Sequence, residues 1–198
     1  MIAIVDYGAG NIFSLKNALD YLGENSVLTN KAEDIINADS FILPGVGAFP
    51  DARRKLADSG LDEVIKSEAS KKPILGICLG MQLLFTESRE FEKTEGLDLI
   101  SGTVDLIKTE YKIPHMGWNE LKIQKESRLL QGVSDGDFVY FVHSFMAYTN
   151  DENVSAYCEY GSKITALAEK GFVYGAQFHP EKSGDTGLKI LSNFCKLK

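Results

Sequence analysis

The sequence predicts an α/β fold with an open, mixed and largely parallel sheet, helices on both faces, and a β-rich second half. Short apolar runs alternate with helical patterns through the first 85 residues, as expected for strand–helix units that build a parallel sheet. These runs are apolar at successive positions, which is typical of strands covered on both faces. A glycine-flanked cysteine between a strand and a helix indicates a nucleophile elbow. The length of 198 residues fits one domain, residues 1–198.

The first half supplies the parallel strands and most of the helices. Residues 2–6 form a continuous apolar strand, and Asn11 is expected to cap a helix over about 12–22. A weak strand at 27–28, a short helix at 32–37 and a strand at 41–43 follow. A helical pattern then runs from about 49 to 68. The run at 73–75 predicts a buried strand leading into Cys78, and residues 80–85 predict the first turns of a helix.

The second half is predicted to be a β-rich insertion or an extension of the sheet. Turn residues separate several short apolar or β-branched runs in this part of the chain. Strands are expected at residues 103–108, 120–123, 138–142, 155–160, 165–168 and 172–177. A helix over about 186–197 closes the chain.

Charge and composition exclude several classes of function. The net charge of −7, with no Lys/Arg-rich run, argues against nucleic acid as the main partner. No apolar stretch reaches the roughly 18–20 residues that span a bilayer, and the N-terminus has the pattern of a first strand rather than a signal peptide. The three cysteines are widely spaced and indicate neither a disulfide framework nor a metal knuckle. We therefore expect a cytoplasmic protein with reduced thiols and no membrane partner.

Cys78 is the leading candidate nucleophile. It sits in Gly76-Ile77-Cys78-Leu79-Gly80, directly after the predicted strand at 73–75. Glycines two positions before and after it permit the sharp strand-to-helix turn of a nucleophile elbow. The turn also places the sulfur at a helix N-terminus, where free N–H groups favour a thiolate. The alternative is a buried packing cysteine, because free cysteine often acts as a small hydrophobe.

A second motif, Gln177-Phe178-His179-Pro180-Glu181, supplies a base and its partner. Residues two apart in extended chain point to the same side, so His179 and Glu181 can face one site. Together with Cys78 they make a plausible Cys–His–Glu triad. A histidine that only bonds within a loop is one alternative. A metal site built from Cys78, His143, His179 and Glu181 is another, but its spacing matches no usual zinc pattern, and we expect no metal.

Two glycine loops have different expected roles. Gly8-Ala9-Gly10 and Gly45-Val46-Gly47 both lack the third glycine of a dinucleotide fingerprint, and no Walker lysine follows either one. We therefore expect no nucleotide cofactor. Pro44-Gly45-Val46-Gly47 ends a strand that neighbours the elbow, and its glycines permit close approach. Its backbone and the N–H group of Leu79 are candidate donors to a developing oxyanion.

These motifs resemble the class I, or triad-type, glutamine amidotransferases. GICLGMQ around Cys78 and HPE at His179–Glu181 match the hallmarks of that family in order and approximate distance. PGVG at 44–47, PHMGWNE at 114–120, YFVHS at 140–144 and QFHPEKS at 177–183 are most similar to one subgroup. That subgroup is the glutaminase subunits of imidazole glycerol phosphate synthase, an enzyme of histidine biosynthesis.

The resemblance implies a role for each site residue. Cys78 attacks the carboxamide carbon of L-glutamine, His179 transfers protons, and Glu181 orients His179. The implied oxyanion residues are Val46, Gly47 and Leu79, the implied substrate-binding residues are Gln82, His143, Ser144 and Phe145, and the implied interface residues are Met116, Trp118 and Asn119. The alternative for Trp118 is a place in the core, since tryptophan is highly buried on average.

The resemblance also implies a partner and a form of regulation. Ammonia would pass through a channel into a (β/α)₈-barrel cyclase subunit, with which the chain would form a heterodimer. The glycines of PGVG would let the oxyanion strand adopt inactive and active orientations, so we expect low glutaminase activity without the cyclase. Other possibilities are a glutaminase for a paralogous synthase, a non-catalytic binding subunit, and a stress protein or peptidase with a cysteine elbow.

Overall fold

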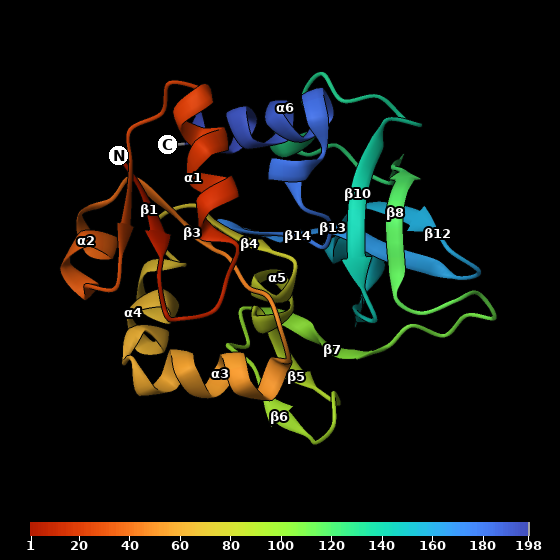
Figure 1. Ribbon diagram of the computed structural model, residues 1–198, viewed down its shortest axis with the longest axis horizontal. Helices are drawn as coiled ribbons and strands as arrows, with labels where there is room; N and C mark the ends of the chain where they lie inside the picture. Colours follow the sequence, from red (N-terminus) through yellow and green to blue (C-terminus); the bar gives the residue numbers. More distant parts are fainter. Residues whose placement is uncertain (198) are drawn as a thin grey trace.

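The central sheet of the protein is mixed and largely parallel, as the sequence predicts. The computed structural model describes residues 1–197, and Figure 1 shows its elements. Within these residues the central sheet has 8 strands. Their order is β2 (Ser26–Thr29), β1 (Ile2–Val5), β3 (Ser40–Leu43), β4 (Ile74–Ile77), β14 (Val173–Ala176), β13 (Lys163–Lys170), β12 (Val154–Glu159) and β9 (Lys122–Ile123). The pairings from β2 to β14 are parallel, and those from β14 to β9 are antiparallel.

Helices cover both faces of the parallel part of this sheet (Figure 1). Helices α1 (Ile12–Tyr21) and α6 (Gly184–Cys195) lie on one face, where Leu19 and Phe194 share a core with Ile4. Helices α3 (Phe49–Asp58), α4 (Leu61–Glu68) and α5 (Leu79–Leu83) lie on the other, where Leu56 shares a core with Val5. Successive strand residues thus enter opposite cores, which explains the continuous apolar runs in the sequence.

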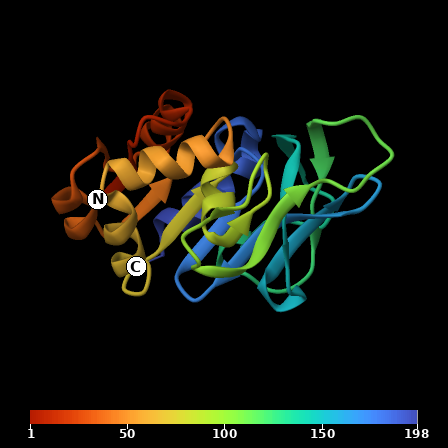
Figure 2. The same ribbon diagram turned by 90° about the horizontal axis from the view of Figure 1, so that it is seen from below.

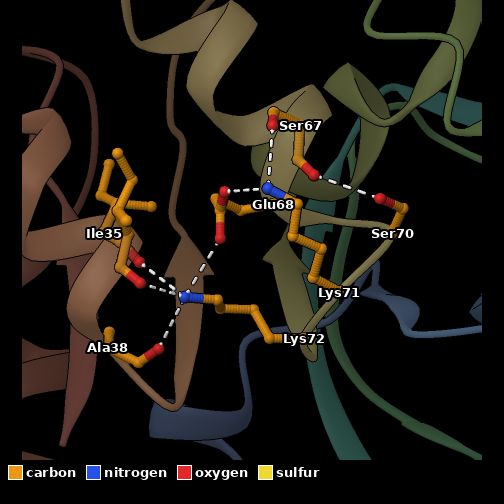
Figure 3. Close-up of polar contacts among 8 residues, drawn as sticks. Ile35, Ala38, Ser67, Glu68, Ser70, Lys71 and Lys72 are labelled. Atoms are coloured by element: carbon orange, nitrogen blue, oxygen red, sulfur yellow. Dashed lines mark hydrogen bonds and ion pairs between the residues drawn. The ribbon is translucent and has the colours of Figure 1, made fainter.

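Helix α2 (Ala32–Asn37) is tied to α4 by Lys72 (Figure 3). The Lys72 ammonium donates to the carbonyl oxygens of Ile35 at 3.3 Å and Ala38 at 2.8 Å, at the C-terminal end of α2. It also pairs with Glu68 Oε2 at 3.2 Å, while Lys71 bonds Glu68 Oε1 at 2.8 Å. The bond from Lys71, and then that from Lys72, lower the pKa of Glu68 against the opposing effect of burial. A cation at this position stabilises the helix end that points at it.

Two smaller sheets build the β-rich half. Figure 2 shows β8 and β10 at the end opposite α2 and α4, whereas β6 lies beside α3. Strand β10 (Phe138–His143) pairs antiparallel with β8 (His115–Glu120). A second sheet has the order β11 (Phe145–Thr149), β7 (Ile100–Leu106), β5 (Phe85–Ser88) and β6 (Thr94–Glu95). Three short 3₁₀ helices, η1 (Arg128–Leu130), η2 (Asp151–Asn153) and η3 (Pro180–Lys182), complete the described residues.

Two predictions in the first half are wrong in detail. The helix expected over 49–68 is divided into α3 and α4, because Gly60 adopts φ +70° and a left-handed residue ends an α-helix. Asn11 stands at the N-cap of α1 but makes no capping hydrogen bond. Its Oδ1 accepts a bond from Ser14 Oγ at 3.3 Å instead.

The elements around the elbow and in the second half also differ from the prediction. Helix α5 ends at Leu83, and Phe85 begins β5 rather than continuing the helix. Strand β8 was not predicted, and in it His115 alone is buried while exposed residues alternate with half-buried ones. Strand β11, which follows β10 after the single residue Ser144, was not predicted either. The strand expected at 120–123 is split, because Glu120 ends β8 and Lys122 begins β9.

Candidate active site

The elbow at Cys78 is present in the structure. Cys78 lies between β4 and α5 with φ +54° and ψ −112°, a conformation that few residues other than glycine adopt. Such a conformation costs on the order of 1–3 kcal/mol and persists only where its surroundings impose it. Its N–H group donates to the carbonyl of Ala176 on β14 at 2.7 Å, and its carbonyl accepts from Gln82 N–H at 3.1 Å. The last parallel strand and the first turn of α5 together hold the strained residue.

The glycines around Cys78 allow the elbow to pack against its own strand and the neighbouring one. A Cβ atom on Gly80 would lie 1.8 Å from the carbonyl oxygen of Leu43, and one on Gly76 would lie 2.6 Å from that of Gly80. A Cβ atom on Gly45 would lie 2.6 Å from the Gly80 nitrogen. These distances are far below van der Waals contact, so a side chain at any of the three would push the elbow away from the strand end at Pro44.

His179 and Glu181 form a buried pair next to the elbow. His179 follows β14, which pairs with β4, and the chain then enters η3 at Pro180. His179 Nδ1 lies 2.8 Å from Glu181 Oε1, and the two side chains are 3% and 2% exposed. The second carboxylate oxygen of Glu181 has no hydrogen-bond partner among residues 1–197. Within the described residues, the side chain of Glu181 is therefore bonded to His179 alone.

The electrostatic surroundings of His179 favour its protonated form. Burial lowers the pKa of His179, but hydrogen bonds to Cys78 and Glu181, together with their negative charges, outweigh burial and raise the pKa to about 9. Because Nδ1 is engaged by Glu181, Nε2 is the nitrogen that remains for Cys78. At neutral pH the imidazolium can donate a proton from Nε2 to a leaving group beside the sulfur.

A cavity of about 470 Å³ joins these groups to most of the other predicted site residues. This volume is within the usual range for sites that hold small molecules. It is lined by Val46, Gly47, Cys78, Leu79, Gln82, Glu90, Phe91, Pro114, Val142, His143, Ser144, Phe145 and His179. The structure thus brings the predicted oxyanion and substrate-binding residues together with Cys78 and His179 at one cavity, while Glu181 lies behind His179.

The three predicted interface residues lie outside this cavity, on β8. Met116 is 61% exposed and Trp118 is 55% exposed, so the alternative that Trp118 belongs to the core is wrong. The Trp118 ring makes an edge contact with Tyr140, with ring centroids 6.1 Å apart. Asn119 Nδ2 donates to the carbonyl of Glu159 on β12 at 3.0 Å and lies 3.2 Å from His115 Nε2.

Three residues of the site were missed in the sequence. Glu90 lines the cavity, and its Oε2 accepts the N–H of Phe49 in the first turn of α3 at 2.8 Å. Burial raises the pKa of Glu90, although the bond from Phe49 opposes this. His115 and Gln177 connect to the cavity through hydrogen bonds to His143 and Gln82. Glu90 stands in an acidic, turn-rich stretch that carries no local signal. Gln177 belongs to the motif that contains His179, but the sequence predicted no role for it.

The alternative of a metal site at Cys78 and His143 is disfavoured by hydrogen bonding. His143 Nδ1 lies 2.8 Å from the carbonyl oxygen of Phe145, and His143 Nε2 lies 3.0 Å from His115 Nδ1, so neither ring nitrogen is free for a metal. Among residues 1–197, no group of three or more His, Cys, Asp or Glu side chains is arranged to hold a metal ion. In the same part of the chain, no helix has both the length and the apolar character needed to cross a membrane.

Known proteins resemble this chain over nearly its whole length. A family model described as glutamine amidotransferase class-I matches residues 3–197, and the chain belongs to that family. It is 52% identical over 195 residues to the imidazole glycerol phosphate synthase subunit HisH of Bacillus thuringiensis (strain Al Hakam) and to that of Bacillus anthracis (strain A0248). Each alignment covers 98% of this chain and 93% of the relative. The resemblance that the motifs indicated, including the subgroup, is confirmed.

Solved structures with the same fold are more distant in sequence. A crystal structure described as a glutamine amidotransferase aligns with a TM-score of 0.76 and 18% identity, covering 98% of both chains. The structure of PurLQS from Thermotoga maritima aligns with a TM-score of 0.73 and 22% identity, covering 98% of this chain and 96% of that one. These similarities confirm the predicted fold class.

Proposed function

We propose that this protein is the glutaminase subunit of an imidazole glycerol phosphate synthase. It hydrolyses L-glutamine to glutamate and ammonia, and it delivers the ammonia to a (β/α)₈-barrel cyclase subunit in the cytoplasm. The observation that carries the proposal is the meeting of an elbow cysteine, Cys78, with the buried His179–Glu181 pair at one cavity. The 52% identity to HisH subunits over nearly the whole chain supports this particular synthase over a paralogous one.

The first half of the reaction is the formation of a thioester. The Cys78 thiolate attacks the side-chain carboxamide carbon of glutamine, and the oxygen of the tetrahedral intermediate is stabilised by N–H groups of Leu79 and the Val46–Gly47 segment. The C–N bond then breaks as protonated His179 transfers its Nε2 proton to the departing nitrogen. Ammonia leaves, the glutamyl group remains on sulfur, and His179 is neutral.

The second half hydrolyses the thioester. Neutral His179 removes a proton from a water molecule, and the resulting hydroxide attacks the thioester carbon within the same oxyanion site. The C–S bond breaks, glutamate is released, and the thiolate and protonated His179 are restored. Glu181 holds Nδ1 of His179 throughout, so the ring presents Nε2 to both the sulfur and the water.

The amino-acid end of glutamine fits acceptor groups in the cavity. Among the described residues that line the cavity, Glu90 has the one carboxylate side chain, and this carboxylate can pair with the α-ammonium group of the substrate. Gln82 uses its NH₂ group in bonds to the Phe145 carbonyl at 2.9 Å and to Gln177 Oε1 at 3.0 Å. Only its Oε1 remains available, so Gln82 would accept a bond from the same ammonium. Ser144 offers a hydroxyl donor for the α-carboxylate.

The partner would dock on the face formed by β8 and the start of β10. Met116, Trp118 and Phe138 are 61%, 55% and 50% exposed, an unusual density of large apolar side chains on one pair of strands. Gly47 adopts φ +102° beside Val46, which is 44% exposed, so the predicted oxyanion segment is lightly packed. Docking could therefore reorient the segment, and activity without the cyclase would be low.

The partner is tested by measuring complex formation and glutamate release with an imidazole glycerol phosphate synthase cyclase and its nucleotide ligand. The proposal expects a stable heterodimer and a large rise in glutamate release. Trp118→Ala should weaken the complex, whereas Tyr21→Ala, which removes a 79% exposed aromatic at the far end of α1, should not. Glutamate release that ignores the cyclase would indicate a paralogous synthase. Binding without hydrolysis would indicate a non-catalytic subunit.

A further inference from the structure

Gln177 connects the nucleophile to the substrate-binding amide. It stands directly after β14, its side chain is completely buried, and its backbone N–H donates to the carbonyl of Ala166 at 2.9 Å. Its Nε2 lies 3.8 Å from the sulfur of Cys78, and its Oε1 lies 3.0 Å from Gln82 Nε2. One buried amide thus contacts both the reacting atom and a residue that lines the glutamine cavity.

The orientation of both amides follows from the Phe145 carbonyl, which can only accept. The atom of Gln82 that lies 2.9 Å from this oxygen must therefore be the NH₂ group. The same NH₂ group also contacts Gln177, so the facing atom of Gln177 must be its oxygen. The NH₂ group of Gln177 is then the group that faces Cys78. No rotation of either amide by 180° preserves these bonds.

A second arm from the same carbonyl reinforces this assignment. His143 Nδ1 must donate to Phe145 O at 2.8 Å, which makes His143 Nε2 an acceptor for His115 Nδ1–H at 3.0 Å. His115 Nε2 then accepts from Asn119 at 3.2 Å. Burial lowers the pKa of His115 to about 4, and it is also the main reason why the pKa of His143 is lowered to about 3. Both rings are therefore neutral, as these hydrogen bonds require. The Phe145 carbonyl oxygen thus accepts two hydrogen bonds, from His143 and Gln82, and a Gln82 amide turned by 180° would place its own oxygen against this carbonyl oxygen.

The contact with Cys78 depends on the charge of the sulfur. Sγ lies between the Gln177 NH₂ group and the carbonyl of Val142, which is 3.9 Å away. A thiol can donate to the Val142 carbonyl, but a thiolate can only accept. Among residues 1–197, the side-chain donors next to the sulfur are the Gln177 amide and His179. A donor in a buried site stabilises the anion more than the neutral thiol.

We propose that Gln177 is a positioning residue for the glutaminase reaction. Its NH₂ group stabilises the Cys78 thiolate, and its carbonyl oxygen holds Gln82 so that the Gln82 oxygen remains available to substrate. This inference rests on the proposed function. The plain alternative is that Gln177 only satisfies buried polar groups, in which case its loss would affect stability and leave the reactivity of Cys78 unchanged.

The test measures the rate of Cys78 alkylation by iodoacetamide as a function of pH, in wild type, Gln177→Met and Gln177→Glu. Iodoacetamide reports on the thiolate without using the amino-acid pocket. Burial raises the pKa values of Cys158 and Cys195 to about 12, so these thiols should react little in the folded protein. Gln131→Met makes the same chemical change at an exposed position after η1 and serves as the control. Thermal unfolding of each variant, followed in parallel, reports on the structure.

The proposal expects the alkylation midpoint to rise in Gln177→Met and to rise further in Gln177→Glu, whose carboxylate repels the thiolate. At a pH below the midpoint, alkylation should slow by about tenfold each time the midpoint rises by about one pH unit. The KM for glutamine should also rise in Gln177→Met. Wild-type midpoints in folded Gln177→Met and Gln177→Glu would overturn the proposal, as would an equal rise in Gln131→Met. Glutamate release by wild type is assayed separately, so failure of the glutaminase function is distinguished from failure of this inference.

Discussion

Replacing Cys78 by alanine should lower the pKa of His179. Burial is the largest influence on this imidazole and lowers its pKa, and the hydrogen bond to Cys78 is the largest of the influences that raise it to about 9. The rise from the ordinary value of 6.5 corresponds to roughly 3 kcal/mol of interaction with its surroundings. In Cys78→Ala only Glu181 opposes burial, so we expect the pKa to fall by at least about one pH unit, or about 1.4 kcal/mol.

Nuclear magnetic resonance of the imidazole rings can measure this change, because the chain has 3 histidines. His115 and His143 have pKa values of about 4 and about 3, so His179 should be the single ring that titrates above pH 6. Wild type should show one titration near pH 9, and Cys78→Ala should show it at lower pH. Glu181→Gln should also lower it, because the carboxylate is the second raising influence.

Two results would refute this reasoning. A His179 midpoint that is the same in wild type and Cys78→Ala would mean that the sulfur and the ring do not interact in the resting protein. Titration of His115 or His143 between pH 5 and 8 would mean that their hydrogen-bonded, neutral arrangement is incorrect. The first result would remove the electrostatic basis for His179 as the proton donor to the departing nitrogen.

Three further predictions follow from other contacts. Glu90→Gln should raise the KM for glutamine by about 10–100-fold with a smaller effect on kcat, because it removes the negative charge but keeps an oxygen that accepts from the Phe49 N–H group. Unchanged steady-state kinetics would exclude the pairing of Glu90 with the α-ammonium group of glutamine. Lys72→Met should lower the free energy of unfolding by about 2 kcal/mol in urea titrations. This is less than the loss expected when a buried ion pair is broken completely, because Lys71 still bonds Glu68. A loss below about 0.5 kcal/mol would contradict this. The lowered pKa of His115 means that the unfolded chain binds this proton at higher pH, so the contribution of His115 to stability is complete above pH 6.5 and is lost as pH falls toward 4. His115→Phe should flatten that decline in urea midpoints measured at pH 7 and pH 5, and an equal decline in both proteins would count against it.

The parts of the site that the sequence revealed are those encoded by neighbouring residues. The elbow needs glycines two positions from Cys78, and His179 and Glu181 are two positions apart, so both patterns are local, although Glu181 reaches His179 from η3 and not from extended chain. Glu90 reaches the cavity only because the segment between β5 and β6 packs against the start of α3 through the bond to Phe49. Gln177 meets Gln82 across 95 positions of sequence, and no periodicity records such a contact.

The difference between local patterns and long-range contacts also explains which strands and helices were predicted incorrectly. The parallel strands were predictable because they are buried on both faces, and Ile4 and Val5 are each 0% exposed although they face different cores. Strand β8 was missed because its exposed Met116 and Trp118 break the apolar pattern. The division of the helix at Gly60 depends on a left-handed backbone conformation, which a helical pattern on both sides conceals.

The proposed chemistry depends above all on Cys78 as the nucleophile of glutamine hydrolysis. We would compare wild type and Cys78→Ala for the rate of glutamate release from saturating L-glutamine, each mixed with an imidazole glycerol phosphate synthase cyclase. We expect the substitution to reduce kcat by at least about 10³-fold while the complex still forms, because no other described group that lines the cavity can form the thioester. Glutamate release by Cys78→Ala at a rate close to that of wild type would contradict it.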